Sequence, residues 1–283
     1  MGFGDAASSM LRAMSPVELA VVSAALTVVL MAVYALVSRA RRSQCDLSVP
    51  LGHMHFDCYV INMPNEKKRM RGFAATFQRC DLAKTHGLIR HKATVGKTVP
   101  VAQYTNSKAL CEILRAERIK YRQKHYELTR GAIGCWLSHR NLWGSVLETD
   151  KEVALIFEDD CIMARNTHAI LNESRVPADW DICLLGYMCN ECAPTDCDEA
   201  VRVTKFFGLH GYMITRRGIE KILRSPKMQL ITKQIDSVLC DMIRDGEITV
   251  YALPEPIAWQ NNADYGTSIQ MELRKVKGVD EWE

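Results

Sequence analysis

The chain has no marked excess of charge, no internal repeat and no low-complexity tract. A formal net charge of +3 over 283 residues is too small to indicate a nucleic-acid-binding protein. Apolar residues make up 48% and charged residues 24%, proportions that exclude wholesale disorder. The length allows one globular domain of about 200–240 residues and an additional segment.

Cysteine, in contrast, is plentiful, with eleven residues. A chain of this length can build a hydrophobic core without a disulfide framework, and most of the cysteines lie in apolar runs typical of buried thiols. Three lie instead in an acidic loop with the spacing C-x2-C-x4-C: Cys189, Cys192 and Cys197. No fourth ligand stands at a usable spacing, so we expect free or paired thiols there rather than a closed zinc site.

The first apolar segment, Leu19 to Val37, contains no charged residue. Its nineteen residues would form a helix about 28 Å long, close to the thickness of a bilayer core. Ser15, Pro16 and Glu18 supply a capping serine, a first-turn proline and a glutamate at the third helical position. A cleavable signal peptide would have a shorter apolar region behind a basic start, and Ser38–Ala40 is a poor cleavage site. The sequence therefore predicts a retained transmembrane helix.

Basic residues flank this predicted anchor unevenly. Three arginines follow it between residues 39 and 42, whereas only Arg12 precedes it. This bias predicts that the rest of the chain lies in the cytosol, in agreement with unpaired cysteines. A single glycosylation sequon at Asn172 points to the opposite side of the membrane.

The chain divides into a tail and anchor at 1–42, a linker at 43–55 and a globular domain at 56–283. In the domain, short apolar runs alternate with helical patterns, which is typical of an α/β fold with a largely parallel sheet and flanking helices. The candidate strands are Phe56–Asn62, Val153–Phe157, Asp181–Leu185, Gly211–Thr215 and Ile248–Ala252. The candidate helices are Glu66–Arg79, Ser107–Tyr126, Ile133–Thr149, Arg217–Arg224 and Lys233–Arg244.

An acidic triplet, Glu158, Asp159 and Asp160, directly follows the apolar run Val153–Phe157. Such a run predicts a buried strand, and open α/β sheets bind ligands at the carboxyl ends of their strands. Adjacent carboxylates repel one another unless a cation or solvent compensates them. Because side chains alternate along an extended chain, Glu158 and Asp160 are expected to point the same way. Two hard oxygen donors suit Mg²⁺ or Mn²⁺, and a solvated acidic turn is the alternative.

A second cluster runs from Gly131 to His139. Gly131 and Gly134 open a predicted helix whose N-terminal amides could face a phosphate or a sugar. Ser138 and His139 follow one turn later, but no carboxylate stands at a recognisable spacing, so a Ser/His nucleophile pair is not expected. Taken alone, His139 is more typical of a hydrogen-bonded packing residue than of a ligand.

Several other segments complete a series that extends along nearly the whole predicted domain, from about Tyr59 to Gln260. Each segment alone is weak evidence of a relationship to a known family, but the order and spacing of all the segments together are specific. The series consists of Tyr59–Met63 with Arg69, Lys92–Gly96, Leu128–Cys135 with Ser138, His139 and Trp143, Glu158–Asp160, Trp180–Ile182, Gly208–Thr215 with Arg217 and Gly218, and Asp236. It resembles glycosyltransferase family 25, which contains bacterial lipo-oligosaccharide galactosyltransferases and collagen-modifying galactosyltransferases.

Two positions depart from the pattern of that family. Ala132 stands where the family usually has glutamate, and Val95 stands where it usually has aspartate. Such departures indicate either an altered donor or acceptor, or a decayed site. The acidic motif is intact, which favours activity.

The resemblance implies a GT-A-like, Rossmann-type domain that transfers a hexose with inversion, commonly galactose from UDP-galactose, to a glycan, lipo-oligosaccharide or protein acceptor. Glu158 and Asp160 would then bind Mn²⁺ or Mg²⁺, which stabilises the leaving diphosphate. Asp236 is the first candidate for the base that takes the acceptor proton, followed by His139 and His210. The residues assigned to binding the nucleotide-sugar donor are Asn62, Arg69, Gly131, Asp159 and His210.

Two alternatives remain open at this point. A non-catalytic, membrane-anchored binding or adhesion module could keep the same fold, but the intact carboxylates disfavour it. A nucleotide-sugar pyrophosphorylase would carry a glycine-rich phosphate loop early in the chain, and Asn62–Arg71 contains none. The sequence names neither the sugar nor the acceptor.

Overall fold

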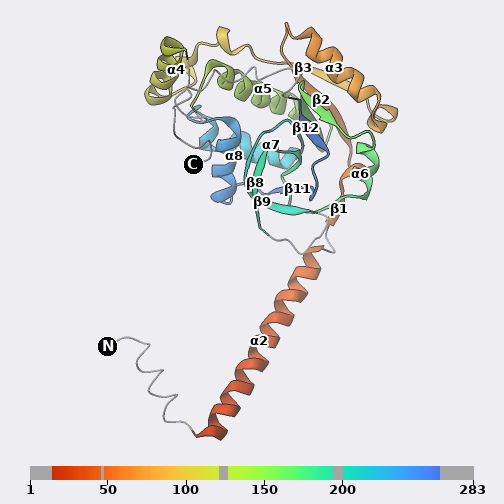
Figure 1. Cartoon of the computed structure of the whole chain (residues 1–283), viewed down its shortest axis with the longest axis vertical. Helices are drawn as coiled ribbons and strands as arrows, with labels where there is room; N and C mark the ends of the chain where they lie inside the picture. Colours follow the sequence, from red (N-terminus) through yellow and green to blue (C-terminus); the bar gives the residue numbers. More distant parts are fainter. Residues whose placement is uncertain (1–14, 46–47, 121–126, 194–199, 262–283) are drawn as a thin grey trace, which may run out of the picture. The chain divides into compact units, whose positions relative to one another are not determined.

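The computed structural model describes residues 15–45, 48–120, 127–193 and 200–261 (Figure 1). The chain divides into two compact units, Met1–Leu47 and Ser48–Glu283. The first unit contains the helix α2 (Pro16–Cys45), which begins as predicted. The carboxylate of Glu18 accepts hydrogen bonds from the amide and the hydroxyl of Ser15, both at 2.8 Å, and the Glu18 amide donates to the Ser15 hydroxyl at 3.3 Å. This reciprocal arrangement is a capping box.

The predicted transmembrane anchor at Leu19–Val37 is not supported. Among the described residues, no helix is both long and apolar enough to cross a membrane. The cytosolic location inferred from the arginines rests on this anchor and stays a prediction.

The second unit is built on one large sheet. Its strand order is β3 (Leu88–Lys92), β2 (Phe56–Asn62), β4 (Val153–Glu158), β10 (Gly211–Thr215), β7 (Ile182–Gly186), β11 (Val250–Ala252), β9 (Val201–Phe207) and β8 (Cys189–Ala193). Only β10 and β9 run opposite to the other six strands, so this sheet is mixed and mostly parallel, in line with the sequence. Two small sheets pair β1 (Ser48–Pro50) with β6 (Arg175–Pro177) and β5 (Cys161–Met163) with β12 (Ala258–Gln260).

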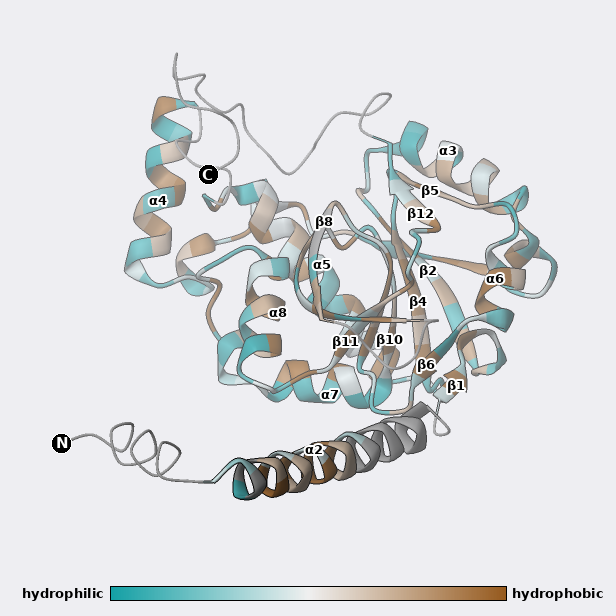
Figure 2. Ribbon diagram, turned by 60° about the horizontal axis from the view of Figure 1, so that its bottom comes forward, coloured by the Kyte–Doolittle hydropathy of each residue, from teal (hydrophilic) through white to brown (hydrophobic). Residues whose placement is uncertain are grey.

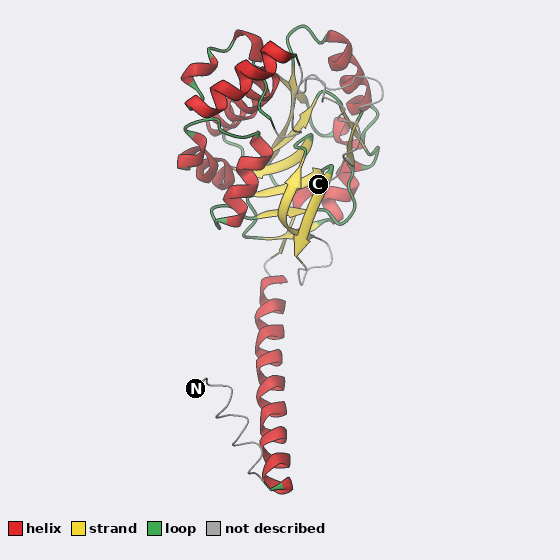
Figure 3. Cartoon of the chain, turned by 60° about the vertical axis from the view of Figure 1, so that its left-hand side comes forward, coloured by secondary structure: helices red, strands yellow, loops and turns green. Residues whose placement is uncertain are grey.

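Alternate residues of the central strands face two separate hydrophobic cores. In β4, Ala154 and Ile156 belong to one core, whereas Val153, Leu155 and Phe157 belong to the other. Helices lie on both sides of the sheet (Figure 3), with their polar faces outward and the apolar strands inside (Figure 2). The first core is covered by α4 (Ser107–Ile119), α5 (Arg130–Leu147), α7 (Arg216–Arg224) and α8 (Ile235–Arg244), and the second by α3 (Lys67–Gln78) and α6 (Thr167–Glu173).

All five candidate strands and all five candidate helices occur, and most of their ends differ from expectation by three residues or fewer. The exception is α4, which ends at Ile119 because Lys120 adopts a left-handed conformation with φ 60°. The rest of that candidate helix, 121–126, lies outside the described residues. The sequence missed β3, whose Arg90, His91 and Lys92 make it a polar edge strand.

The segment expected to be a linker, 43–55, contributes to the second unit from Ser48 onward. β1 pairs antiparallel with β6, and Leu51 is fully buried. Gly52 approaches α6 so closely that a Cβ atom there would lie 2.7 Å from the backbone nitrogen of Asn172. Proline and glycine, which suggested a linker, here form a tight turn packed against a helix.

The N-terminal half of α5 packs directly on the loop after β3. A Cβ atom on Gly134 would lie 2.7 Å from the Gly96 nitrogen and 2.7 Å from the Thr94 carbonyl oxygen. The Ser138 hydroxyl accepts a hydrogen bond from the Thr94 amide at 2.8 Å and donates to the Gly134 carbonyl at 2.6 Å. The most specific sequence block therefore fastens this loop to α5, and Ser138 has a structural role.

Two glycines of α5, one inside this contact and one outside it, should respond to alanine substitution with opposite changes in stability. Gly134→Ala should lower the free energy of unfolding by about 1–3 kcal/mol, because backbone atoms must move to admit the methyl group. Gly144→Ala, where a Cβ atom would meet nothing within 4 Å, should raise it by about 0.5–1 kcal/mol. Urea unfolding of the two variants checks both signs. A neutral or stabilising Gly134→Ala would contradict the close packing.

Candidate active site

The acidic triplet lies at the carboxyl end of the central strand β4. Glu158 is its last residue, and Asp159 and Asp160 form the turn that leads into β5. Alternation along β4 sends Glu158 toward α5 and Asp159 toward α3. The expectation that Glu158 and Asp160 point the same way assumes an extended chain, and the turn ends that alternation. Asp160 instead shares a partner with Asp159, the guanidinium of Arg69.

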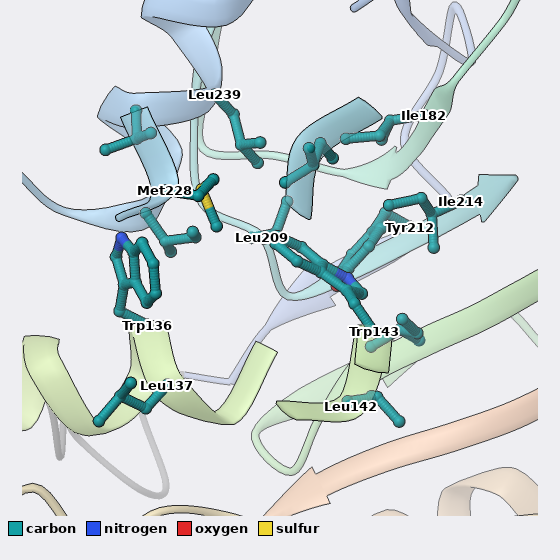
Figure 4. Close-up of a cluster of buried hydrophobic side chains, with 14 of the residues drawn as sticks. Trp136, Leu137, Leu142, Trp143, Ile182, Leu209, Tyr212, Ile214, Met228 and Leu239 are labelled. Atoms are coloured by element: carbon teal, nitrogen blue, oxygen red, sulfur yellow. The ribbon is translucent and has the colours of Figure 1, made fainter. Parts of the chain in front are cut away.

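A chain of hydrogen bonds holds Glu158 in place. Its Oε1 lies 3.2 Å from Nε2 of His139, and Nδ1 of His139 lies 2.8 Å from the hydroxyl of Tyr212. The indole of Trp143 donates to the same hydroxyl at 2.9 Å. The tautomer in which Nε2–H donates to Glu158 and Nδ1 accepts from Tyr212 satisfies all of these groups. Figure 4 shows Trp143 beside Tyr212 in the core under α5, and His139 is fully buried next to them.

The carboxylates of Asp159 and Asp160 are held by residues of β2, α3 and β12, away from the histidine that holds Glu158. Asn62 donates to Asp159 at 2.6 Å, and Nη1 of Arg69 lies 3.3 Å from Asp159 and 3.5 Å from Asp160. Gln260 donates to the same Asp160 oxygen, Oδ2, at 3.2 Å. The buried Arg69 is thus engaged by carboxylates and sets their positions.

The surroundings change the pKa values of the three carboxyl groups in different directions. Burial raises the pKa of Glu158, but the hydrogen bond from His139 and weaker effects of other neighbouring groups outweigh burial and leave the pKa below its usual range. Burial raises the pKa of Asp159 against the opposing effects of Asn62 and Arg69. Burial and the Glu158 charge raise the pKa of Asp160 to about 7. The protein alone therefore leaves negative charge uncompensated at Asp160.

These features fit a divalent cation. Oδ1 of Asp160 and Oδ1 of Asn62 are buried and have no hydrogen-bond partner. Buried polar atoms are normally satisfied, so an unpaired carboxylate oxygen close to further carboxylates is a position that a cation could occupy. Oxygen donors are those preferred by Mg²⁺ and Mn²⁺. Glu158 and Asp160 are the residues that would hold such an ion.

One cavity connects most of the predicted site residues. Its lining includes Arg69, Gly131, Glu158, Asp159 and Asp160, and its volume is about 80 Å³. This volume suits an ion with a few waters, while ligand pockets usually measure about 300–1,000 Å³. A nucleotide sugar would therefore reach the carboxylates only by extending toward the surface. Gly131 lies at the N-terminus of α5, where amide groups and the helix dipole favour a phosphate.

A larger cavity of about 410 Å³ lies elsewhere, between α3 and β5. Arg79, Arg165 and Asn261 are among its lining residues, and none of the residues that line it is acidic or a histidine. It shares no lining residue with the cavity of the acidic triplet. The carboxylates therefore line the smaller of these two cavities.

Asp236 lies in the first turn of α8. Its carboxylate accepts hydrogen bonds from the Ser237 amide at 2.7 Å and the Gly208 amide at 3.4 Å. Burial and, more weakly, the charge of Glu158 raise its pKa against these amides. Asp236 does not line the cavity, but it lies close enough to Glu158 to feel that charge.

His210 lies just before β10 and is almost fully buried. Its carbonyl accepts a hydrogen bond from the Glu158 amide at 3.0 Å, and its Nε2 lies 3.3 Å from the Ala258 carbonyl. Nδ1 has no hydrogen-bond partner among the described groups. Burial lowers the pKa of His210, so it is neutral near pH 7 and more suited to positioning than to charge.

Four residues that shape this site had no role assigned to them from the sequence: Cys135, Trp143, Tyr212 and Gln260. Gln260 lies 100 positions beyond the carboxylate it binds, so no local pattern reveals it. In the cysteine-rich loop, Cys192 is a free, exposed thiol. Cys197 and the side chain of Cys189 lie outside the described residues, so the expectation of no zinc site there stays a prediction.

Comparison with known proteins identifies the relatives of this chain. The profile of glycosyltransferase family 25 (LPS biosynthesis protein) matches residues 55–207. Procollagen galactosyltransferase 1-B of Xenopus laevis is 32% identical over 109 residues, which cover 35% of this chain and 18% of that protein. A putative glycosyltransferase of Haemophilus influenzae is 26% identical over 187 residues, which cover 64% of this chain and 61% of that protein.

Among solved structures, one of GalNAc-T7 with UDP, GalNAc and Mn²⁺ aligns with a TM-score of 0.40 and 12% identity, over 80% of this chain and 45% of that chain. The matched region spans less than a fifth of the Xenopus relative and about three fifths of the Haemophilus relative. The family profile covers more than half of the 283 residues. The chain belongs to glycosyltransferase family 25.

Proposed function

We propose that this chain is a metal-dependent, inverting glycosyltransferase with a GT-A-like fold. It transfers a hexose, galactose from UDP-galactose, to a glycan, lipo-oligosaccharide or protein acceptor. The observation that carries the proposal is the pair of carboxylates formed by the half-buried Glu158, the last residue of β4, and the buried Asp160 in the turn after it. Oδ1 of Asp160 has no hydrogen-bond partner. Family membership supports glycosyl transfer, and the name of the Xenopus relative, a procollagen galactosyltransferase, supports galactose and a protein acceptor.

In this mechanism Glu158 and Asp160 would hold a divalent cation, which would offset the negative charge on the departing diphosphate. Arg69, Asn62 and Gln260 fix the two aspartates, and His139 fixes Glu158, so the ligands are in position before the donor arrives. Gly131 at the start of α5 would face the donor phosphates. The anomeric carbon loses its bond to the UDP oxygen and gains one to the acceptor oxygen.

Asp236 is proposed to take the proton of the acceptor hydroxyl. The amides of Ser237 and Gly208 hold its carboxylate in one orientation. Its raised pKa brings its basicity closer to neutral pH, which favours proton transfer in the transition state. His139 is less suited, because both of its ring nitrogens are engaged inside the protein.

A panel of UDP-sugars, scored for UDP release with the purified chain, tests the proposed donor. UDP-galactose should give the highest rate, and proton NMR of the transferred sugar should show a β-linkage from the α-linked donor. Release from no UDP-sugar in the presence of Mn²⁺ and a peptide or glycan acceptor would favour the alternative, a binding or adhesion module that keeps the fold. A retained α-linkage would exclude Asp236 as a base in direct displacement.

A further inference from the structure

A thiol and an imidazole lie next to the first carboxylate of the acidic triplet, and together the three side chains could bind a metal ion. Cys135 and His139 stand one turn apart on α5, and Glu158 faces them from the end of β4. One ligand atom from each lies within 4.8 Å of the others, and this is the only such group of three among the described residues. We propose that Cys135, His139 and Glu158 form a binding site for zinc, in addition to the site proposed for Mn²⁺ or Mg²⁺.

The distances match the edges of a tetrahedral zinc site. With Zn–N and Zn–O bonds of about 2.0–2.1 Å and a Zn–S bond of about 2.3 Å, the N···O edge is about 3.3 Å and the S···O edge about 3.5 Å. Here Nε2 of His139 lies 3.2 Å from Oε1 of Glu158, and Sγ of Cys135 lies 3.6 Å from the same oxygen. The two edges that meet at Glu158 therefore already have tetrahedral lengths, and the ligand atoms of Cys135 and His139 lie within 4.8 Å of each other. A fourth position remains for water.

The surrounding residues hold the imidazole in the orientation that zinc requires. Nδ1 of His139 lies 2.8 Å from the hydroxyl of Tyr212, which Trp143 also contacts. A hydrogen bond of this kind on the second ring nitrogen orients metal-binding histidines in proteins. Nε2 is thereby directed at Glu158 and Cys135. On zinc binding, the ring proton moves from Nε2 to Nδ1, which then donates to the hydroxyl of Tyr212, while the Cys135 thiol loses its proton to solvent.

The choice of metal follows from the sulfur. Thiolate and imidazole ligands favour zinc, whereas a site of carboxylate oxygens favours Mg²⁺ or Mn²⁺. Glu158 is the one residue common to both sets. If the proposed transferase function holds, zinc withdraws Glu158 from the catalytic ion and inhibits the enzyme. The zinc site itself does not depend on that function, and its test below uses no activity measurement.

Cobalt titration of the metal-free chain tests the site, because Co²⁺ replaces zinc and reports its ligands by absorption. We expect one equivalent of Co²⁺ to give the intense visible bands of a four-coordinate ion and a near-ultraviolet thiolate-to-cobalt band, both removed by zinc. Cys135→Ser should abolish the thiolate band. Cys192→Ser, which changes an exposed thiol in β8, should leave it intact.

A second variant tests the carboxylate ligand without removing the thiol that produces the cobalt band. Glu158→Gln retains the thiol and should weaken cobalt binding by more than about tenfold, the lower limit seen for residues that merely support metal ligands. Far-ultraviolet circular dichroism checks that each variant is folded. Absence of the thiolate band in the parent chain, its survival in Cys135→Ser, or its loss in Cys192→Ser would each overturn the proposal.

Discussion

Asp160→Asn is expected to reduce transferase activity in Mn²⁺ by about a thousandfold or more. The substitution is nearly isosteric but removes one negative charge from the proposed cation site, where the ion contributes several kcal/mol to transition-state stability. A thousandfold loss corresponds to about 4 kcal/mol at about 1.4 kcal/mol per factor of ten. Steady-state rates at saturating Mn²⁺ measure the loss. Asp245→Asn, which changes a surface carboxylate paired with Lys227 and Arg244, is the matched control and should keep full activity.

The same substitution should not destabilise the metal-free protein. Asp160 has a pKa of about 7 in the folded chain against an ordinary value of 3.8. Between these values the folded state holds a proton that the unfolded state releases, so the wild-type protein loses stability as pH rises from about 4 to about 7. Asparagine does not titrate. Asp160→Asn should therefore melt a few degrees above the wild type at pH 8 without metal and close to it at pH 4.

Opposite effects on rate and stability distinguish a functional site from a structural one. A carboxylate retained for folding would give a variant that melts lower at every pH. An acidic turn without function would leave both the rate and the metal dependence unchanged. Either outcome would argue against the cation site.

Asp236→Asn should lower kcat by about 10²–10⁴-fold, the usual contribution of a general base. The amide keeps the shape of the side chain, and its one oxygen can still accept from the Ser237 amide. The NH2 group that replaces the second oxygen loses the longer contact with the Gly208 amide, and the side chain cannot take a proton. Binding of UDP should be unaffected, because Asp236 does not line the cavity of the carboxylates. Asp241→Asn is the control on the same helix, since that carboxylate pairs with Lys233 and Arg244 at the surface.

The pH profile gives a separate test of the base. In the wild type, kcat/KM should fall at low pH as Asp236 takes up a proton, at a pH above the usual range of an aspartate because its pKa is raised. In Asp236→Asn this acidic limb should disappear. A small loss of kcat with an unchanged acidic limb would transfer the role to another group.

The central part of the site could be predicted from local sequence. An apolar run followed by three carboxylates specifies both a buried strand and the ligand-binding end of a sheet, and β4 ends at the first of those residues. The glycine-rich block before His139 likewise predicts the start of α5 within three residues. Such signals lie within a few residues of the feature they describe.

What could not be predicted depends on contacts between distant segments. The hydrogen bond of Gln260 with Asp160 and the contact of Tyr212 with His139 join parts of the chain that are far apart in sequence. The side on which Asp160 lies was also missed, because the alternation that governs a strand ends at the turn. The polar edge strand β3 gives no hydrophobic signal, since water covers much of it.

The dependence of UDP release on a divalent cation decides whether Glu158 and Asp160 hold a catalytic ion. The chain is stripped with a chelator, dialysed and assayed with UDP-galactose and acceptor, first without metal and then with added Mn²⁺. We expect negligible release without metal, recovery on addition of Mn²⁺, and no recovery in Asp160→Asn. Full release from the stripped wild-type chain, or equal recovery in Asp160→Asn, would contradict a catalytic cation at Glu158 and Asp160.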